Sequence, residues 1–251
     1  MNMEYTLKIK DERYFNNGNL ILNGNLILPF LKDEGNHPLG EKIKEWLQSK
    51  YDLTELVRKN KHGVKAEALN KALRAKLEIE GAHKETHVLY NGFSHKGKEG
   101  FDFSFYDKDY NTACIRNYFV GERGCYNGGE RLDGVYKDFK MTSKEWKKEL
   151  SKINTPYGED CKTEKQRLTV VGEIQFGNWA MIEHDIQRLM DAEEQDVSID
   201  YYIYITATGN LAQKLSDGIV NYEKAASFFE NHKLVKVPMW LIGLDLSTEV
   251  E

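Results

Sequence analysis

The sequence has little of several features that define particular classes of protein. It contains three cysteines, Cys114, Cys125 and Cys161, and none of them shows the CxxC or Cys/His spacing of a zinc site. It contains four prolines, and no stretch rich in Pro, Gly and Ser divides the chain. No apolar run reaches the roughly 20 residues that a membrane helix needs, and the first ten residues lack the apolar segment of a signal peptide. These absences argue against a disulfide framework and predict one cytoplasmic domain with no membrane span.

An excess of basic residues is also absent. The 35 Lys and Arg residues against 40 Asp and Glu give a formal net charge of -5 and a pI near 5.9. Affinity for phosphate normally comes from a Lys/Arg excess, so the overall charge does not point to nucleic acid. A local basic surface, or an acidic cluster that binds metal, is nevertheless compatible with it. The glycine-rich stretches lack the GxxxxGK[ST] pattern of a nucleotide-binding loop.

The first two thirds of the chain give separate local signals. Two apolar runs flank Asn23-Gly24, a dipeptide that suits a type I′ turn, and predict a β-hairpin over residues 19–28. Residues 39–80 show helical periodicity, and Gly81 is placed to end this helical region. Shorter patterns predict strands at 86–90, 101–107, 113–120 and 131–139, and an amphipathic helix at 143–154.

The last third alternates between the two kinds of secondary structure. We expect a strand at 168–176, a helix at 178–191, a strand at 198–208, a helix at 218–232 and a strand at 237–246. The first of these helices should bury Trp179, Ile182, Ile186 and Leu189. This alternation predicts an α/β core with a mixed central sheet flanked by helices.

The strand at 168–176 ends in "VVGEIQFGNW", which places Glu173 and Gln175 two positions apart. Residues two apart on a strand point to the same side of the sheet. Two polar side chains at the end of a buried strand need partners, because each unpaired group costs about 1–3 kcal/mol. One interpretation is structural, with both groups satisfied by a helix N-terminus or a neighbouring side chain. The other is a site for a hard cation such as Mg²⁺, built from the Glu173 carboxylate and an adjacent backbone carbonyl.

Three segments, in order, resemble one enzyme family. "GEIQFGNWA" is similar to the active-site strand of type II restriction endonucleases of the PD-(D/E)xK superfamily, in the Bgl-type and Bst-type branch where Gln replaces the usual Lys. The matching residues are Glu173, Gln175, Phe176, Asn178 and Trp179. "LSDGIVNYEKA" resembles the family's loop and Tyr-Glu helix, and "VPMWLIGL" resembles its Val-Pro strand. The resemblance covers residues 168–245.

The resemblance implies Mg²⁺-dependent, sequence-specific hydrolysis of phosphodiester bonds in double-stranded DNA. Asp133 and Glu173 would hold the metal together with the Ile174 carbonyl, and Gln175 would orient the attacking water. The family's acid often lies about ten residues before the Glu, whereas Asp133 lies 40 residues before it (173 − 133). Asp138 and Asp160 are therefore alternatives to Asp133.

Further expectations follow from the same resemblance. Asn178, Ser216 and Asp217 occupy the positions that reach base edges, where Asn can pair with adenine and Asp can accept from cytosine. A homodimer would match a palindromic site, and a cognate DNA methyltransferase would belong to the same restriction-modification system. The expected organisation is a single endonuclease domain over residues 1–251. It would comprise an N-terminal hairpin and helices at about 1–85, inserted loops and strands at about 90–165, and a catalytic core at about 130–250.

Two other functions stay open on the sequence. A non-specific or repair-type nuclease of the same superfamily would carry the same strand. A non-catalytic DNA-binding protein could keep the fold and lose the chemistry, in which case Glu173 and Gln175 would be dispensable.

Overall fold

The computed structural model describes the chain in eleven ranges. They are residues 5–16, 19–21, 39–51, 63–86, 100–110, 148, 151–152, 166–194, 199–215, 218–231 and 237–248. The chain divides into two compact units, the first formed by Met1–Ala82 with Val170–Glu251 and the second by His83–Thr169. The first unit contains the strand that carries Glu173 and Gln175.

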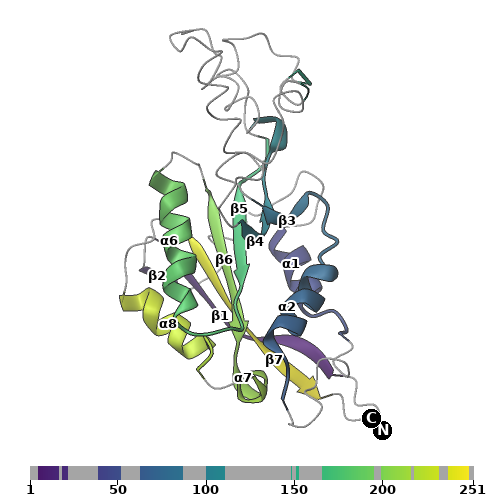
Figure 1. Ribbon diagram of the computed structural model, residues 1–251, viewed down its shortest axis with the longest axis vertical. Helices are drawn as coiled ribbons and strands as arrows, with labels where there is room; N and C mark the ends of the chain where they lie inside the picture. Colours follow the sequence, from purple (N-terminus) through teal and green to yellow (C-terminus); the bar gives the residue numbers. More distant parts are fainter. Residues whose placement is uncertain are drawn as a thin grey trace. The chain divides into compact units, whose positions relative to one another are not determined.

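A mixed sheet forms the centre of the first unit (Figure 1). Its strands lie in the order β2-β1-β7-β6-β5. Their bounds are β1 Tyr5–Asn16, β2 Asn19–Ile21, β5 Val170–Ile174, β6 Tyr201–Ala207 and β7 Met239–Thr248. Strand β1 runs antiparallel to β2 and β7, whereas β5, β6 and β7 are parallel. Every residue of β5 and β6 is buried, as expected of parallel strands covered on both faces.

Helices cover both faces of this sheet. Helices α6 (Met181–Glu194) and α8 (Tyr222–Asn231) lie on one face, and α1 (Leu39–Leu47) and α2 (Ala66–Ala75) lie on the other (Figure 1). The short α7 (Gly209–Lys214) follows β6 and packs against β7. None of the helices in the described part of the chain is both long and apolar enough to cross a membrane.

The expected alternation of the last third is confirmed, but α6 and the start of α8 differ from the prediction. Ile182, Ile186 and Leu189 are buried as predicted, but Trp179 is 51% exposed. The helix begins at Met181, so Trp179 precedes it and does not follow its periodicity. The predicted helix at 218–232 is shorter, because the chain at Asn178 and Ile219 forms an isolated β-bridge before α8 begins.

The N-terminal expectations are confirmed in part. Two helices occur in the described part of 39–80, and the Trp46 indole of α1 donates to the Leu73 carbonyl of α2 at 2.9 Å. Helix α2 ends at Ala75, so Gly81 does not cap it; Gly81 has φ 79° and precedes β3 (Ala82–Thr86). Of the hairpin predicted at 19–28, residues 19–21 form β2 and pair with β1, and the rest lies outside the described residues.

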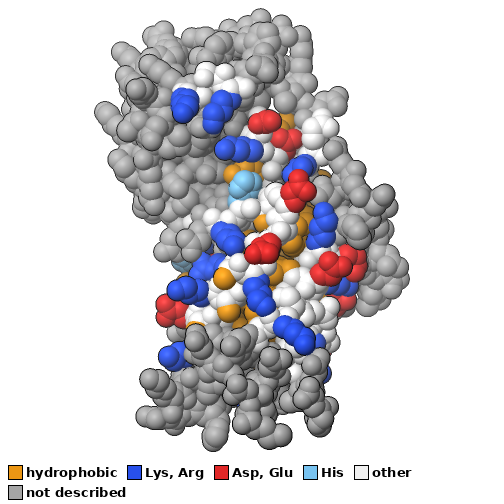
Figure 2. Space-filling view, turned by 90° about the vertical axis from the view of Figure 1, so that its right-hand side faces the viewer, with side chains coloured by type: hydrophobic (Ala, Val, Ile, Leu, Met, Phe, Trp, Pro, Cys, Tyr) orange, Lys and Arg blue, Asp and Glu red, His pale blue; other side chains and the backbone are white. Residues whose placement is uncertain are grey.

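The outer side of the α1 and α2 layer carries charges of both signs. Figure 2 shows this side, where basic side chains lie among acidic ones over the described surface. Within α2, Leu69 and Leu73 are buried, whereas the charged residues of the helix are not. This helix is therefore amphipathic, with its charged face turned to solvent.

The second unit contains β4 (Phe101–Phe105), which confirms the strand expected at 101–107. Phe101, Phe103 and Phe105 are buried, and Asp102 is half-buried. Just after the strand, the two carboxylate oxygens of Asp107 accept from the backbone amides of Tyr110 and Gln166, both at 2.9 Å. The strands predicted at 113–120 and 131–139 and most of the helix predicted at 143–154 lie outside the described residues.

Candidate active site

Glu173 lies at the carboxyl end of β5, Gln175 follows the strand directly, and both side chains face helix α6. Glu173 is the fourth residue of the strand, beside Tyr204 of β6 in the parallel register. Gln175 follows directly after the strand, and its backbone amide donates to the Ile205 carbonyl at 2.8 Å. The prediction that the two side chains point to the same side is confirmed, because each contacts a polar residue of α6.

Glu173 is a buried carboxylate with a charged partner. It is 4% exposed and forms an ion pair with the Arg188 guanidinium, which donates to its Oε1 atom. The nearby Tyr202 is fully buried, and its burial raises the pKa of the phenol; the charges of Glu173 and Asp185 raise it further, while Arg188 lowers it. Arg188 therefore supplies the positive charge that a carboxylate needs in this low-dielectric region.

The Gln175 amide is held at both ends. Its Nε2 atom donates to Oδ2 of Asp185 at 3.1 Å, and its Oε1 atom accepts from the Gly177 amide at 2.8 Å. Asp185 is 2% exposed and also accepts from the Tyr204 hydroxyl at 3.2 Å. A Cβ atom at Gly177 would lie 2.8 Å from Gln175 Oε1, so only glycine leaves room for this contact without displacing the amide.

The Ile174 carbonyl, between these two side chains, also has a partner. Its oxygen accepts from Nδ2 of Asn70 in α2 at 2.7 Å. The peptide places this oxygen opposite the Gln175 amide that bonds to β6, and therefore on the side of β5 away from β6. The other polar atom of Asn70, Oδ1, is buried and has no hydrogen-bond partner among the described residues. A buried acceptor oxygen therefore lies beside the carbonyl.

The segment after β5 is joined to the segment before α8. The Trp179 amide donates to the Gly218 carbonyl at 2.9 Å, and the Val220 amide donates to the Gly177 carbonyl at 2.8 Å. Asn178 lies between these bonds, is exposed, and accepts from the Ala180 amide through its Oδ1 atom at 3.1 Å. Two segments that are about 40 residues apart in the sequence thus run side by side.

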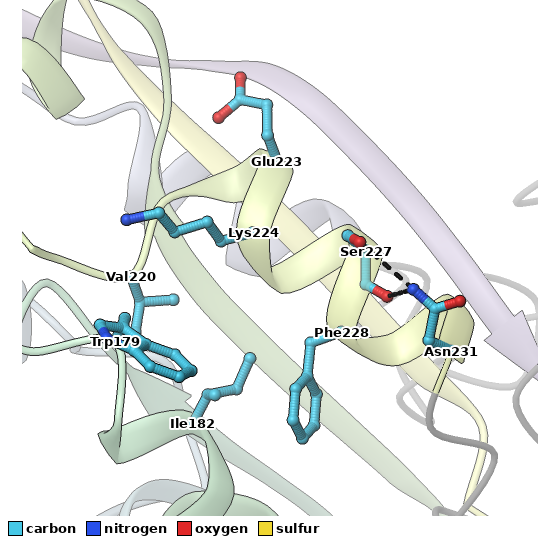
Figure 3. Close-up of a pocket in the computed structure, with 8 residues that line it drawn as sticks. All are labelled: Trp179, Ile182, Val220, Glu223, Lys224, Ser227, Phe228 and Asn231. Carbon is cyan, nitrogen blue, oxygen red and sulfur yellow. Dashed lines mark hydrogen bonds between the residues drawn. The ribbon is translucent and has the colours of Figure 1, made fainter.

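A groove opens beside this junction, between α8 and the start of α6 (Figure 3). It encloses about 520 Å³. Its lining is Trp179, Ile182, Val220, Glu223, Lys224, Ser227, Phe228 and Asn231. The Asn231 amide donates to the Ser227 carbonyl of the same helix at 2.8 Å. The groove is mostly apolar and does not include Glu173 or Gln175.

The remaining predicted residues are not placed. Asp133, Asp138, Asp160, Ser216 and Asp217 lie outside the described residues. Within the described ranges, no three His, Cys, Asp or Glu side chains come together in a way that could hold a metal ion. Of the predicted metal ligands, the structure describes the Glu173 carboxylate and the Ile174 carbonyl.

The sequence interpretation missed Asp185, Arg188 and Asn70. A signal for Asp185 was present, because it lies three residues after Ile182 and four before Leu189, on the apolar face of α6. A carboxylate on such a face needs a polar partner. For Asn70 we find no equivalent signal, because its contact joins residues 104 positions apart.

The comparison with known families decides the identity. A family model described as restriction endonuclease BglII/BglIII matches residues 34–244 of the 251. The chain belongs to the BglII/BglIII restriction endonuclease family. A search of curated proteins found no match.

Membership of the BglII/BglIII family confirms the predicted resemblance to type II restriction endonucleases. It also confirms the predicted fold class, a mixed sheet with helices in a restriction-endonuclease-like core. The protein is a site-specific deoxyribonuclease, and its substrate is DNA. Glu173 and Gln175 both have protein partners, as the structural interpretation expected.

Proposed function

We propose that this restriction endonuclease hydrolyses double-stranded DNA with Mg²⁺ at the carboxyl end of β5. Glu173 and the Ile174 carbonyl are the proposed metal ligands on this strand, and Gln175 is the proposed catalytic amide. The observation that carries the proposal is a row of three polar groups on consecutive residues, namely a carboxylate, a backbone carbonyl and a side-chain amide. Asn70 of α2 contacts this row from one face of the sheet, and α6 contacts it from the other.

The donor atoms fit a hard cation. Mg²⁺ prefers carboxylate, carbonyl and water oxygens and keeps several of its waters. Glu173 supplies a carboxylate, and Ile174 supplies a carbonyl that has a second lone pair besides the one bound to Asn70. The buried Oδ1 atom of Asn70 is an acceptor that a cation-bound water can satisfy. When bound, the cation stabilises charge on the scissile phosphate and lowers the pKa of the attacking water.

The chain's own groups have distinct parts in this proposal. Asn70 holds the Ile174 carbonyl in place, and Arg188 compensates the Glu173 charge when no cation is present. Gln175 directs the attacking water through its amide. An amide is uncharged, so it cannot replace the positive charge that a lysine would bring to the phosphate. Gln175 would therefore leave more of that charge stabilisation to a bound cation than a lysine would.

The second acidic ligand remains a proposal among several residues. Asp133 is our first choice, with Asp138 and Asp160 as the alternatives. Asp102 belongs in the same test, because it is a half-buried carboxylate on a strand. Asp107 is not a candidate, because both of its carboxylate oxygens already accept hydrogen bonds from backbone amides.

Asn178, Ser216 and Asp217 are the proposed base-reading residues. Support comes from the hydrogen bonds that join Gly177–Val220 and Trp179–Gly218, because they tie the chain beside Asn178 to the chain that directly follows Asp217. Side chains from two such segments can read neighbouring bases in one groove.

We further propose that the enzyme is a homodimer that cuts a palindromic site, alongside a cognate DNA methyltransferase. The groove between α6 and α8 supports a contact with a second copy. Trp179, which lines this groove, and Met181, the first residue of α6, are large, exposed hydrophobic residues, at 51% and 39%. Glu223 and Lys224 both line it, so a two-fold related copy can pair each with the other.

A panel of acid variants tests the metal site. Asp133→Asn, Asp138→Asn, Asp160→Asn and Asp102→Asn would be compared with Glu173→Gln for DNA cleavage over a Mg²⁺ titration, with Asp107→Asn as the control. We expect one of the four to lose activity as completely as Glu173→Gln. Equal activity of Glu173→Gln and the unaltered enzyme would defeat the proposal. Discrete fragments distinguish it from a non-specific nuclease, and DNA binding without cleavage would indicate a non-catalytic protein.

A further inference from the structure

Gln175 donates a hydrogen bond to Asp185, a residue that has no role in the proposed chemistry. Asp185 lies on α6, is 2% exposed, and accepts at one oxygen, Oδ2, from both Gln175 Nε2 and the Tyr204 hydroxyl. Its other oxygen, Oδ1, lies 3.9 Å from Nδ1 of His184. A carboxylate accepts hydrogen bonds and does not donate them when it is ionised.

This contact decides which way the Gln175 amide faces. An amide can be turned by 180°, which exchanges its oxygen and its nitrogen. With the amide turned, Oε1 would face the Asp185 carboxylate and Nε2 would face the Gly177 N–H, so an acceptor would meet an acceptor and a donor a donor. Turning the amide would therefore lose both hydrogen bonds. The two bonds together hold the amide in one of its two orientations.

We infer that Asp185 is a positioning residue that fixes the Gln175 amide, so that Gln175 offers the reaction one defined N–H and one oxygen lone pair. An amide has two N–H donors and two lone pairs, and Asp185 and the Gly177 amide each occupy one of them. Asp185 acts through Gln175 and does not touch the DNA or the reacting atoms. The inference rests on the proposed catalytic role of Gln175.

The surroundings of Asp185 are rigid enough for this task. Tyr204 is in the middle of β6 and is fully buried, so its hydroxyl holds Asp185 from the sheet. Gly177 lacks a side chain at the one place where a Cβ would press on Gln175 Oε1. Oriented catalytic groups need such supporting bonds, because their loss costs roughly 10–100-fold in activity.

The test uses Asp185→Ala, Asp185→Asn and a matched control, Asp191→Ala. Asp191 lies on the same helix and accepts from another Gln amide, Nε2 of Gln187 at 2.8 Å, but that pair is exposed. The Asn variant keeps an oxygen where Oδ2 lies, so it can still accept from Gln175 and Tyr204. It should preserve the orientation that the Ala variant loses.

The first readout is the side-chain amide signal of Gln175 in a ¹H–¹⁵N spectrum, assigned by its loss in Gln175→Ala. It needs neither metal nor DNA, so it decides the orientation even if the proposed chemistry fails. We expect a slowly exchanging signal that moves toward the position of exposed Gln amides in Asp185→Ala and stays in Asp185→Asn and Asp191→Ala. An unchanged signal in Asp185→Ala would overturn the inference. If Asp185→Ala does not fold, Gly177→Ala must shift the same signal.

The second readout is the single-turnover cleavage rate. Asp185→Ala should lose about 10–100-fold with DNA affinity in EDTA unchanged, and adding it to Gln175→Ala should cause no further loss. Losses that multiply in the double variant would show that Asp185 acts independently of Gln175 and would contradict the inference. Absence of cleavage by the unaltered enzyme would instead defeat the proposed function.

Discussion

Glu173 is a carboxylate that the fold keeps away from water. Its side chain is 6% exposed, and that of its partner Arg188 is 13% exposed. Removing one member of such a pair leaves an uncompensated buried charge, which is far more costly than losing an exposed pair. The contact therefore matters for stability as well as for the proposed metal site.

Replacing Arg188 by Met should destabilise the metal-free protein by about 3–5 kcal/mol, because Glu173 would stay buried without its counter-charge. Urea unfolding in EDTA measures the effect. Arg13→Met is the matched control, because Arg13 pairs with Glu230 at the surface, where both side chains are at least 40% exposed. That change should cost at most about 1 kcal/mol. Equal losses in the two variants would show that Arg188 does not compensate Glu173.

Asn70→Ala should raise the Mg²⁺ concentration needed for half-maximal cleavage by roughly 10–100-fold. The reason is that Asn70 holds the Ile174 carbonyl and presents a buried acceptor next to it. A Mg²⁺ titration of the cleavage rate is the measurement, with Asn231→Ala as the control, since Asn231 is exposed and its side chain bonds to Ser227 of its own helix. An unchanged Mg²⁺ dependence would remove Asn70 from the metal site.

At the scale of whole elements, Asp245 of β7 secures the turn into α7. Its Oδ1 atom accepts from the amides of Leu211 and Leu246, and its Oδ2 atom accepts from Lys10 at 3.2 Å. Gly209 at the start of α7 has φ 52°, and a Cβ there would lie 2.3 Å from Asp245 Oδ2. A side chain at position 209 would therefore clash with the Asp245 carboxylate, and glycine leaves room for it.

Asp245→Ala should cost about 1–3 kcal/mol at neutral pH, because it leaves buried amides unpaired. Burial by itself would raise the pKa of Asp245, but the hydrogen bonds from the Leu211 amide, Lys10 and the Leu246 amide outweigh burial and hold the pKa below the ordinary value of an aspartate. A lowered folded-state pKa contributes stability above the unfolded value, and that contribution is lost as the pH falls through the folded value. Urea unfolding should show a difference that shrinks in acid. A difference that stays constant down to about pH 2 would contradict this.

The sequence predicted the elements whose pattern is local. The strands β5, β6 and β7 and the helices α6 and α8 have clear periodicity, and all five occur near the expected residues. The prediction that Trp179 belongs to the buried face of α6 was wrong, because periodicity cannot locate the start of a helix to within one or two residues. Strand β1 was missed, since its pairing with β7 joins the two ends of the chain.

The candidate site shows the same limit. Glu173, Ile174 and Gln175 were identified from a short motif, and the strand period correctly placed both side chains on one side. The contacts of Arg188 and Asn70 depend on how helices pack on the sheet, which no local pattern encodes. For Asp185 the local pattern shows only that a carboxylate on the apolar face of α6 needs a partner, and it does not identify Gln175 as that partner. A helix that looks simply amphipathic in the sequence thus supplies two of the three residues that hold the motif.

At the scale of the molecule, the proposed homodimer makes a separate prediction. Phe228 lines the groove between α6 and α8, so Phe228→Asp should shift the protein from dimer to monomer by introducing a charge into an apolar contact. Light scattering over a concentration series measures this, and Lys152→Asp, at an exposed position of the second unit, is the control. A monomer in the unaltered protein would contradict the dimer, and a dimer unaffected by Phe228→Asp would place its interface elsewhere.

The most direct test of the proposed chemistry is digestion of a long DNA of known sequence by the purified protein, in Mg²⁺ and in EDTA, beside Glu173→Ala. We predict discrete fragments in Mg²⁺ whose ends share one short palindrome, and intact DNA in EDTA and with the variant. Cleavage in EDTA, or the same fragments from Glu173→Ala, would contradict a metal-dependent site at the end of β5.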